Sequence, residues 1–375
     1  MKLVLSIIFS TIITLGFTQA LEEEINVVGY KFLDYGSNMP ENIRSSRSAV
    51  LVSVPSIRGE RGDWMGLSKE FHKVFKESGI DAVAYYFVED VMAGPQVSSS
   101  IAESFTEREI ENLIFISRVD VEFGGKKSER YVTVVTPFNG KYDLMDHGQK
   151  AWKQQEKKLD KLLKKIEKEA SKTGEKTNNL IVDSPEFFKD TPLITKNRFE
   201  RYPSDLKIDK LAIPKFEIVE VPDKKPIGVV NNKVEEEIEK GNKQARRFNW
   251  QMNDIVKAYP FKYELVDYDV NNEKELWDQG FQFVLLKIHT SGEVAKRLLD
   301  YPEDEFGEDM VTVKPREDGS MTFRTIPATA NIYKYYVKHL YTGDIYVGEA
   351  WDADEIWQDA IKNFITNLKK ETGVR

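Results

Sequence analysis

A helix, turn and strand near residue 70 limit the possible folds most, because their apolar pattern occurs twice. In residues 67–78 the apolar side chains have the spacing of one helical face, and Ser78-Gly79 leads into a strand-like run from Ile80. The same spacing returns near residue 250, and Phe261 follows Val256 by five residues, as Ile80 follows Phe75. The matching positions are Leu67, Phe71, Val74 and Phe75, and Phe248, Met252, Ile255 and Val256.

Two further pairs of segments repeat in the same order along the chain. The runs Asn112–Ile116 and Gln282–Leu286 both change from a polar residue to continuous apolar residues, which is typical of entry into a buried strand. The third pair places apolar residues at equal spacing on two predicted helices: Trp152, Leu159 and Leu163 on one, and Trp357, Phe364 and Leu368 on the other. Three matches in one order predict a duplicated unit.

The order of the predicted elements defines the unit. Each copy is expected to run strand, helix, strand, helix, strand, strand, helix, which predicts an α/β fold, with α+β as the alternative. Each unit would be a small mixed sheet with helices packed on it, and the two units would follow each other in tandem. The first strand is predicted at Ala49–Val54 in the first unit and at Ile227–Val230 in the second.

The domain limits follow from the repeat and from the proline content. We predict a first α/β domain over 21–173 and a second over 227–375. Six of the 14 prolines fall in 174–226, which disfavours regular helix there and predicts a proline-rich linker arm. Because the arm also carries apolar groups such as Phe187-Phe188, we expect it to pack along the domains and to add an edge strand.

Residues 1–20 are typical of a secretory signal peptide. Lys2 precedes an apolar run, and Thr18-Gln19-Ala20 offers small residues for cleavage after Ala20. No transmembrane segment is expected once this segment is removed. The sequence therefore predicts a secreted protein, periplasmic or extracellular, and the absence of cysteine fits a bacterial cell envelope.

Charge and cysteine content exclude several classes of function. The formal net charge of −8 disfavours nucleic acid, which selects clustered basic residues. The absence of cysteine excludes disulfides, thiol catalysis and thiolate metal sites. The four histidines form no metal-binding motif, and the acidic run Asp300–Asp309 lacks the ligand spacing of an EF-hand. The sequence predicts no metal ion and no cofactor.

The loop between the first strand and the first helix is the candidate ligand site. Its glycines let backbone N–H groups approach an anion, the helix N-terminus adds partial positive charge, and two arginines could bind a phosphate or carboxylate. The predicted ligand-binding residues are Arg58, Gly59, Arg61, Gly62 and Gly66. The loop lacks the Lys-Ser/Thr of a P-loop, and the second unit has Asn231-Asn232-Lys233 instead. A flexible surface loop is the alternative.

The order of elements and the end of the second unit carry a resemblance. The segment Tyr341–Gly348, with the sequence Tyr-Thr-Gly-Asp-Ile-Tyr-Val-Gly, precedes an amphipathic helix. This arrangement resembles the small α/β domains of bacterial envelope proteins, namely the TolB N-terminal domain and the curli-secretion CsgG family. The resemblance implies a non-catalytic role in envelope assembly or recognition, and it carries over no catalytic residue.

Two hypotheses for function follow. The first is a non-enzymatic binding or envelope-assembly protein that contacts other envelope proteins. The second is a hydrolase of glycans or peptides with its site between the two repeats. Such an enzyme needs two carboxylates at a set distance, and the chain has many acids whose distances are determined only by the folded structure. A substrate-sized cleft with buried carboxylates or histidines favours the enzyme, whereas a broad apolar surface or an open sheet edge favours the binding module.

Overall fold

The structure is a computed structural model of the 375-residue chain. It describes residues 33–36, 38–55, 61–123, 126–178, 180–188, 197–220, 229–302, 305, 307–315 and 320–374. The predicted signal peptide over 1–20, and Arg58 and Gly59 of the predicted anion loop, lie outside the described residues. Within the described ranges, no helix combines the length and the apolar character needed to cross a membrane.

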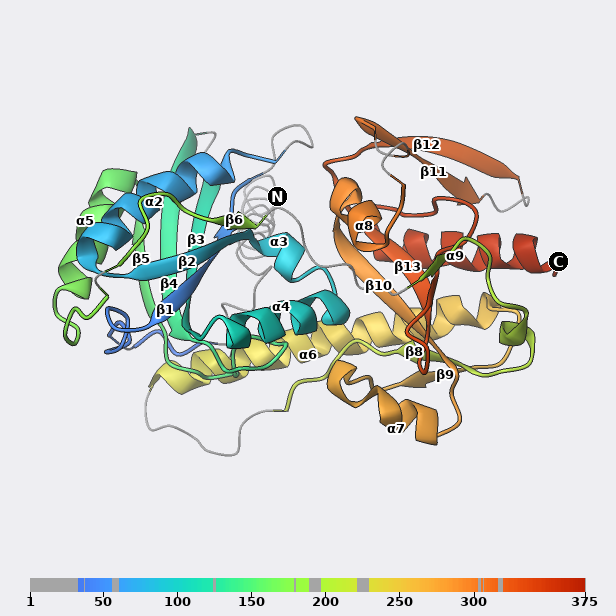
Figure 1. The fold of residues 1–375 in the computed structure, drawn as a ribbon. Helices are drawn as coiled ribbons and strands as arrows, with labels where there is room; N and C mark the ends of the chain where they lie inside the picture. Colours follow the sequence, from blue (N-terminus) through green and yellow to red (C-terminus); the bar gives the residue numbers. More distant parts are fainter. Residues whose placement is uncertain are drawn as a thin grey trace, which may run out of the picture.

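The first of two mixed six-stranded sheets has the strand order β5-β4-β3-β1-β2-β6 (Figure 1). Its unit contains, in chain order, β1 (Arg47–Ser53), α2 (Trp64–Ser78), β2 (Asp81–Phe87), α3 (Val88–Val91), α4 (Pro95–Glu107), β3 (Ile110–Phe123), β4 (Lys126–Pro137), β5 (Trp152–Glu156), α5 (Leu159–Ala170) and β6 (Phe187–Phe188).

The second sheet has the order β7-β14-β13-β10-β8-β9, and a separate two-stranded sheet pairs β11 with β12. This unit contains β7 (Arg198–Phe199), η3 (Ser204–Lys207), β8 (Leu211–Pro214), α6 (Val229–Ile255), η4 (Val256–Ala258), β9 (Tyr263–Val266), η5 (Val270–Asn272), α7 (Glu273–Asp278), β10 (Phe283–Ser291), α8 (Gly292–Leu298), β11 (Asp309–Pro315), β12 (Met321–Pro327), β13 (Asn331–His339), β14 (Ile345–Tyr346) and α9 (Trp357–Thr372).

The two sheets share one topology in five of their six strands, while β6 and β7 lie at opposite edges. In each, the first strand lies between the second and third strands and is parallel to both. The third strand then pairs antiparallel with a fourth, and the fourth with a fifth. The equivalent strands are β1 and β8, β2 and β9, β3 and β10, β4 and β13, and β5 and β14. The predicted α/β fold is confirmed, and the common strand order is what two copies of one unit require.

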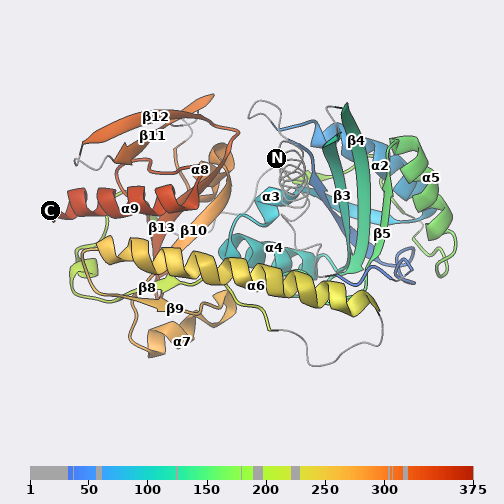
Figure 2. The ribbon, with the colours of Figure 1, turned by 180° about the vertical axis from the view of Figure 1, so that it is seen from behind.

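Three hydrophobic clusters arrange the elements in layers (Figures 1 and 2). The outer face of the first sheet packs against α2 and α5, where Phe71 and Phe75 are buried. The outer face of the second sheet packs against α6 and α9, where Met252 and Val256 are the matching residues. Between the sheets lies one shared cluster, to which α3, α4 and α8 contribute. The two units therefore share a core.

The repeated helix α2 is fixed at both ends by its own sequence. The side chain of Asp63 accepts a hydrogen bond from the N–H of Gly66 at 2.7 Å and caps the first turn. Gly79 ends the helix in the left-handed region, with φ of 82°, and its N–H donates to the carbonyl of Lys76. The turn expected at Ser78-Gly79 is thus where α2 leads into β2.

The second sheet begins earlier in the chain than its expected first strand. The strand predicted at Ile227–Val230 is wrong in the part that the structure describes, because α6 begins at Val229; residues 227 and 228 lie outside the described residues. The first strand is instead β8, within the segment 174–226 that was predicted as a linker arm. Pro214 closes this short apolar strand, and the surrounding proline content hid it. The same segment adds β6 to one edge of the first sheet and β7 to one edge of the second.

Two of the sequence matches are displaced. Trp152 lies on β5 instead of the closing helix, because that helix begins at Leu159. In the third strands, Leu113 faces the shared core, whereas Phe283, its predicted match, faces the outer core beside α9. Side chains alternate along a strand, so a shift of one residue exchanges the two faces. The strand match is right in order and wrong by one residue in register.

Candidate ligand-binding cleft

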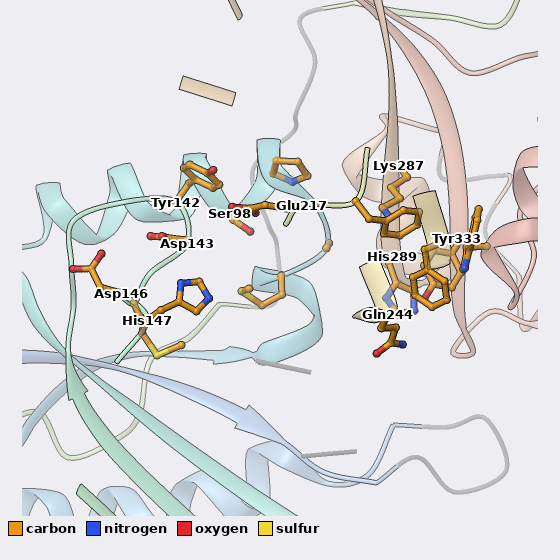
Figure 3. A pocket seen from close by; sticks show the side chains of 18 of the residues that line it. Ser98, Tyr142, Asp143, Asp146, His147, Glu217, Gln244, Lys287, His289 and Tyr333 are labelled. Carbon is orange, nitrogen blue, oxygen red and sulfur yellow. The ribbon is translucent and has the colours of Figure 1, made fainter. Parts of the chain in front are cut away.

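A cleft of about 590 Å³ lies between the two units (Figure 3). The first unit supplies the segment after α3, the start of α4 and the loop between β4 and β5. The second unit supplies the extended segment after β8, together with α6, β10, β13 and α9. The lining residues are Leu33, Met92, Ala93, Gly94, Pro95, Ser98, Tyr142, Asp143, Met145, Asp146, His147, Phe216, Glu217, Gln244, Phe248, Lys287, His289, Tyr333 and Trp357.

Lys287 lines this cleft without an ion pair. Side chains alternate along β10, so Lys287 lies on the same face as Phe283 and Leu285, which pack in the outer core of the second sheet. Its Nζ is 3.8 Å from the centroid of the Phe216 ring. Burial lowers the pKa of Lys287 to about 8. Among the described residues, no carboxylate forms an ion pair with this ammonium group.

His289 forms a flat platform beside Lys287. Its ring stacks on Tyr333, which lies directly opposite on β13, with centroids 3.9 Å apart and planes inclined by 3°. Burial, together with the nearby charge of Lys287, lowers the pKa of His289 to about 4. The imidazole is therefore uncharged at neutral pH, and Lys287 supplies the positive charge of this wall.

Two asparagines of α6 fix the extended segment 215–220. The Asn249 side chain accepts a hydrogen bond from the Phe216 N–H at 2.7 Å and donates one to the Phe216 carbonyl at 2.8 Å. Asn242, about two helical turns earlier, makes the same two contacts with Val219, both at 2.8 Å. The amides imitate the pairing of a β ladder, so this segment has a defined position although it is not in a sheet.

The fixed segment completes an aromatic corner around Lys287. The ring of Phe216 lies 5.1 Å from that of Phe248 and 5.0 Å from that of Trp357, measured between centroids. A second cavity of about 250 Å³ continues from this corner and shares Tyr142, Phe216 and Lys287 with the first. The ammonium group therefore lies over one ring of this aromatic corner, and burial there disfavours its protonated form.

Acidic residues gather around Tyr142, from the loop between β4 and β5. Burial raises the pKa of the Tyr142 hydroxyl, and the charges of Glu217, Asp269 and Asp143 raise it further. These three carboxylates therefore lie near one phenol. Figure 3 shows Tyr142 and Asp143 across the pocket from Lys287. The cleft thus has a negative side and a positive side.

Backbone contacts hold the first unit against the strand that carries Lys287. The Ala93 carbonyl accepts a hydrogen bond from the His289 N–H at 2.7 Å. A Cβ on Gly94 would lie 2.8 Å from the carbonyl oxygen of Lys287, so a side chain there would force the two backbones apart. The position of the lysine relative to the first unit is therefore set by close backbone approach.

The described part of the predicted anion loop lies at the contact between the units. Arg61 donates to both carboxylate oxygens of Asp90, at 2.8 and 2.5 Å, and to the Ser291 hydroxyl at 3.2 Å. Gly62 adjoins Arg61, and Gly66 lies in the first turn of α2. The structure brings none of the three into the lining of the cleft. Because Asp90 already pairs with Arg61, an anion would compete with that carboxylate, and anion binding at this loop stays a prediction.

No motif in the sequence indicates the cleft, whose residues come from segments that are far apart in the chain. Lys287 is nevertheless visible as the one charged residue in the apolar run from Phe281 to Ile288. A charge within a buried strand needs either a partner or a function. That signal could have identified the positive side of the cleft, whereas Tyr142 and Glu217 carry no comparable signal.

Comparisons with known proteins give no relative for this chain. No protein-family model, no curated protein and no solved structure matches it. The resemblance to the TolB N-terminal domain and the CsgG family therefore stays a prediction, and function has to be inferred from the cleft itself.

Proposed function

We propose that this protein is a non-enzymatic binding protein that takes a small organic anion into the cleft between its units. The observation that carries the proposal is the unpaired ammonium group of Lys287 among aromatic rings. A buried charge without a partner costs free energy. The carboxylate of a ligand would supply the missing partner, and such costly positions are characteristic of binding sites.

The walls of the cleft suit a ligand with an apolar body. Phe216, Phe248 and Trp357 offer ring faces and edges, while the stacked pair of His289 and Tyr333 offers a flat surface. The volume of about 590 Å³ falls in the range of roughly 300–1,000 Å³ typical of small-molecule sites. An amphipathic ligand fits this combination better than an inorganic anion does.

We also propose that binding takes place outside the cytoplasm, in the periplasm or beyond the cell. The support is the signal-peptide pattern of residues 1–20. Envelope proteins are the partners that we propose, because a binding protein in that compartment would pass its ligand to them or recognise it together with them.

Removing the charge of Lys287 should abolish the preference of the cleft for anions. Calorimetry would compare benzoate, phenylacetate and cinnamate with their primary amides. We expect the wild type to bind the carboxylates at pH 7, and Lys287→Met to bind them about 10- to 100-fold more weakly, as for a hydrogen bond to a charged group. The amides should bind both proteins alike.

Lys257→Met is the matched control, because this lysine is exposed and, among the described residues, pairs only with Asp254 at 3.0 Å. It should leave carboxylate binding unchanged. In the wild type the affinity should fall as pH rises above about 8, where Lys287 loses its proton. Equal carboxylate affinity in Lys287→Met and the wild type would exclude Lys287 as the anion-binding group.

Lys287→Met should also stabilise the protein near neutral pH. The folded-state pKa of about 8 lies below the ordinary 10.5, so below pH 8 the folded protein bears the full cost of the charge. Between pH 8 and 10.5 the folded protein has already released this proton, whereas the unfolded chain still holds it. The cost of the charge to the folded state therefore falls as pH rises through this range. We expect a gain of about 1–3 kcal/mol at pH 7 that shrinks toward pH 10, measured by urea unfolding. A variant less stable than the wild type at pH 7 would contradict a net cost of the partly buried Lys287 charge.

A hydrolase of glycans or peptides is the second candidate function, and the acids around Tyr142 favour it. Glu217 and Asp143 both line a cleft of substrate size. If the protein cleaves a glycan or peptide substrate, Glu217→Gln should abolish turnover while the protein still binds benzoate. Absence of cleavage with every substrate tested, together with carboxylate binding, leaves the binding function.

A further inference from the structure

We infer that the ligand of the cleft is a short peptide with free ends, whose carboxylate meets Lys287 and whose amine meets the acids around Tyr142. This inference rests on the proposed function and adds the class of ligand. It follows from the two charged sides of the cleft, from their separation, and from the groups between them.

The positive side is a built site for one carboxylate. Lys287 enters the cleft from β10, and its Nζ lies 3.8 Å from the centroid of the Phe216 ring. Asn249 holds Phe216 in place through hydrogen bonds to both its backbone N–H and its carbonyl. The neighbouring His289 adds no charge at neutral pH. A single carboxylate would neutralise this side.

The negative side is available to an ammonium group. Within the described residues, no cation pairs with Glu217. Asp143 accepts a hydrogen bond from Asn139 at 2.7 Å through one carboxylate oxygen, which leaves the other oxygen for a ligand. The ring of Tyr142 lies among these acids and adds a face that attracts a cation. A primary amine matches this combination.

The two sides do not neutralise each other. Burial lowers the pKa of Lys287, and no carboxylate of the described residues forms an ion pair with it. Figure 3 shows Lys287 and Asp143 on opposite sides of the pocket. A simple anion would satisfy one side only, and a cation the other. A ligand that satisfies both must carry both charges, separated by a body that spans the cleft.

The groups between the two sides suit a peptide bond. Gln244 of α6 lines the cleft, and its amide has the donor and the acceptor that a peptide group requires. On the same helix, Asn242 and Asn249 already hold the backbone of segment 215–220 in that manner. Phe216 and Trp357 provide contact area for an apolar side chain.

The test uses dipeptides with blocked and free ends. Calorimetry on the full secreted chain would compare Leu-Phe, Ala-Phe, Lys-Phe and Glu-Phe with their N-acetylated and C-amidated forms. We expect at least one free dipeptide to bind ten or more times tighter than either blocked form. Lys287→Met should remove the discrimination against the amide, and Glu217→Gln the discrimination against the acetylated form. Glu220→Gln, on the same segment but outside the lining, should change neither.

The outcomes separate this inference from the proposed function. If N-acetylated dipeptides bind as tightly as free ones while the amides bind weakly, the amine is not recognised; the peptide inference then fails, while the anion site stands. The peptide inference also fails, and the anion site also stands, if no dipeptide binds but benzoate or phenylacetate does so through Lys287. If C-amidated dipeptides bind as tightly as free ones, the peptide inference fails; if no carboxylate binds at all, both fail. Unchanged melting of Glu217→Gln would show that its effect on binding is not a loss of folding.

Discussion

Replacing Lys334 by methionine should lower the free energy of unfolding by about 3–5 kcal/mol, the usual cost of leaving one member of a buried ion pair alone. Both Lys334 and Asp352 are fully buried. The Lys334 Nζ donates to the Asp352 carboxylate at 2.5 Å and to the Val347 carbonyl at 2.7 Å, and Asn367 donates to the second carboxylate oxygen at 3.1 Å. Without the lysine, the buried carboxylate would keep uncharged hydrogen-bond donors, the Asn367 amide and a backbone N–H, and would lose the ammonium group.

Denaturant unfolding followed by tryptophan fluorescence would measure this loss. Burial already raises the pKa of Asp352, and the charge of Lys334 opposes that rise, so removing the lysine should raise the pKa further. The loss should therefore be smaller at acid pH, where the carboxyl group is neutral. The double variant Lys334→Met, Asp352→Asn should recover much of it. Lys314→Met, which breaks a half-exposed pair with Asp359, should cost less than about 1 kcal/mol. A loss below that value in Lys334→Met would disprove the role of the pair.

Lys334, which is fully buried, and Lys287, which is partly buried, are two lysines of the second sheet whose charges the fold treats differently. Lys334 on β13 faces the inside of the molecule, and its ammonium group donates hydrogen bonds to the Asp352 carboxylate and the Val347 carbonyl. Lys287 on β10 faces the other side of the same sheet, and among the described residues its ammonium group contacts an aromatic ring and no carboxylate. If Lys287 served stability, a partner such as Asp352 would be expected beside it. Its isolation is therefore the physical basis for a ligand in the cleft.

The repeated unit could be predicted because helical spacing records burial directly. Phe71 and Phe75 on α2 match Met252 on α6 and Val256 at the start of η4, and each pair lies in the outer core of its own sheet. Helical periodicity spreads the signal over several residues, so it survives individual substitutions. The register of the strands could not be predicted from the sequence. A strand that is buried on both faces is a continuous apolar run, which does not show which of its residues point to which face.

Local composition misled the prediction where tertiary contacts decide the structure. The Lys-Gln-Gln sequence that follows Trp152 disfavours a strand, yet pairing with β4 makes one. The short strand β8 was hidden among prolines although it lies inside its sheet, between β10 and β9. The cleft was beyond prediction for a related reason: Tyr142, Glu217 and Lys287 meet only because two units pack together, and no local pattern encodes that contact.

The matched residues of the two copies offer the second large effect. Phe71→Ala should cost about 3–5 kcal/mol and Met252→Ala about 2–5 kcal/mol, because each removes a fully packed side chain from an outer core. Trp250→Ala, on the same helix as Met252 but 71% exposed, should change stability by less than about 0.5 kcal/mol. Calorimetric melting would measure all three variants. A melting temperature unchanged by Phe71→Ala would mean that α2 does not cover the sheet in this way.

The shape of the transition carries further information, because the two outer cores are separate while the core between the sheets is shared. If the shared core couples the units, each variant should lower one common transition, and the double variant should lose roughly the sum of the two single losses. Two transitions, with Phe71→Ala moving only one of them, would show that the units unfold independently. The cleft would then lie between two bodies free to move, and the fixed separation of Lys287 from the acids around Tyr142 would no longer follow from the fold.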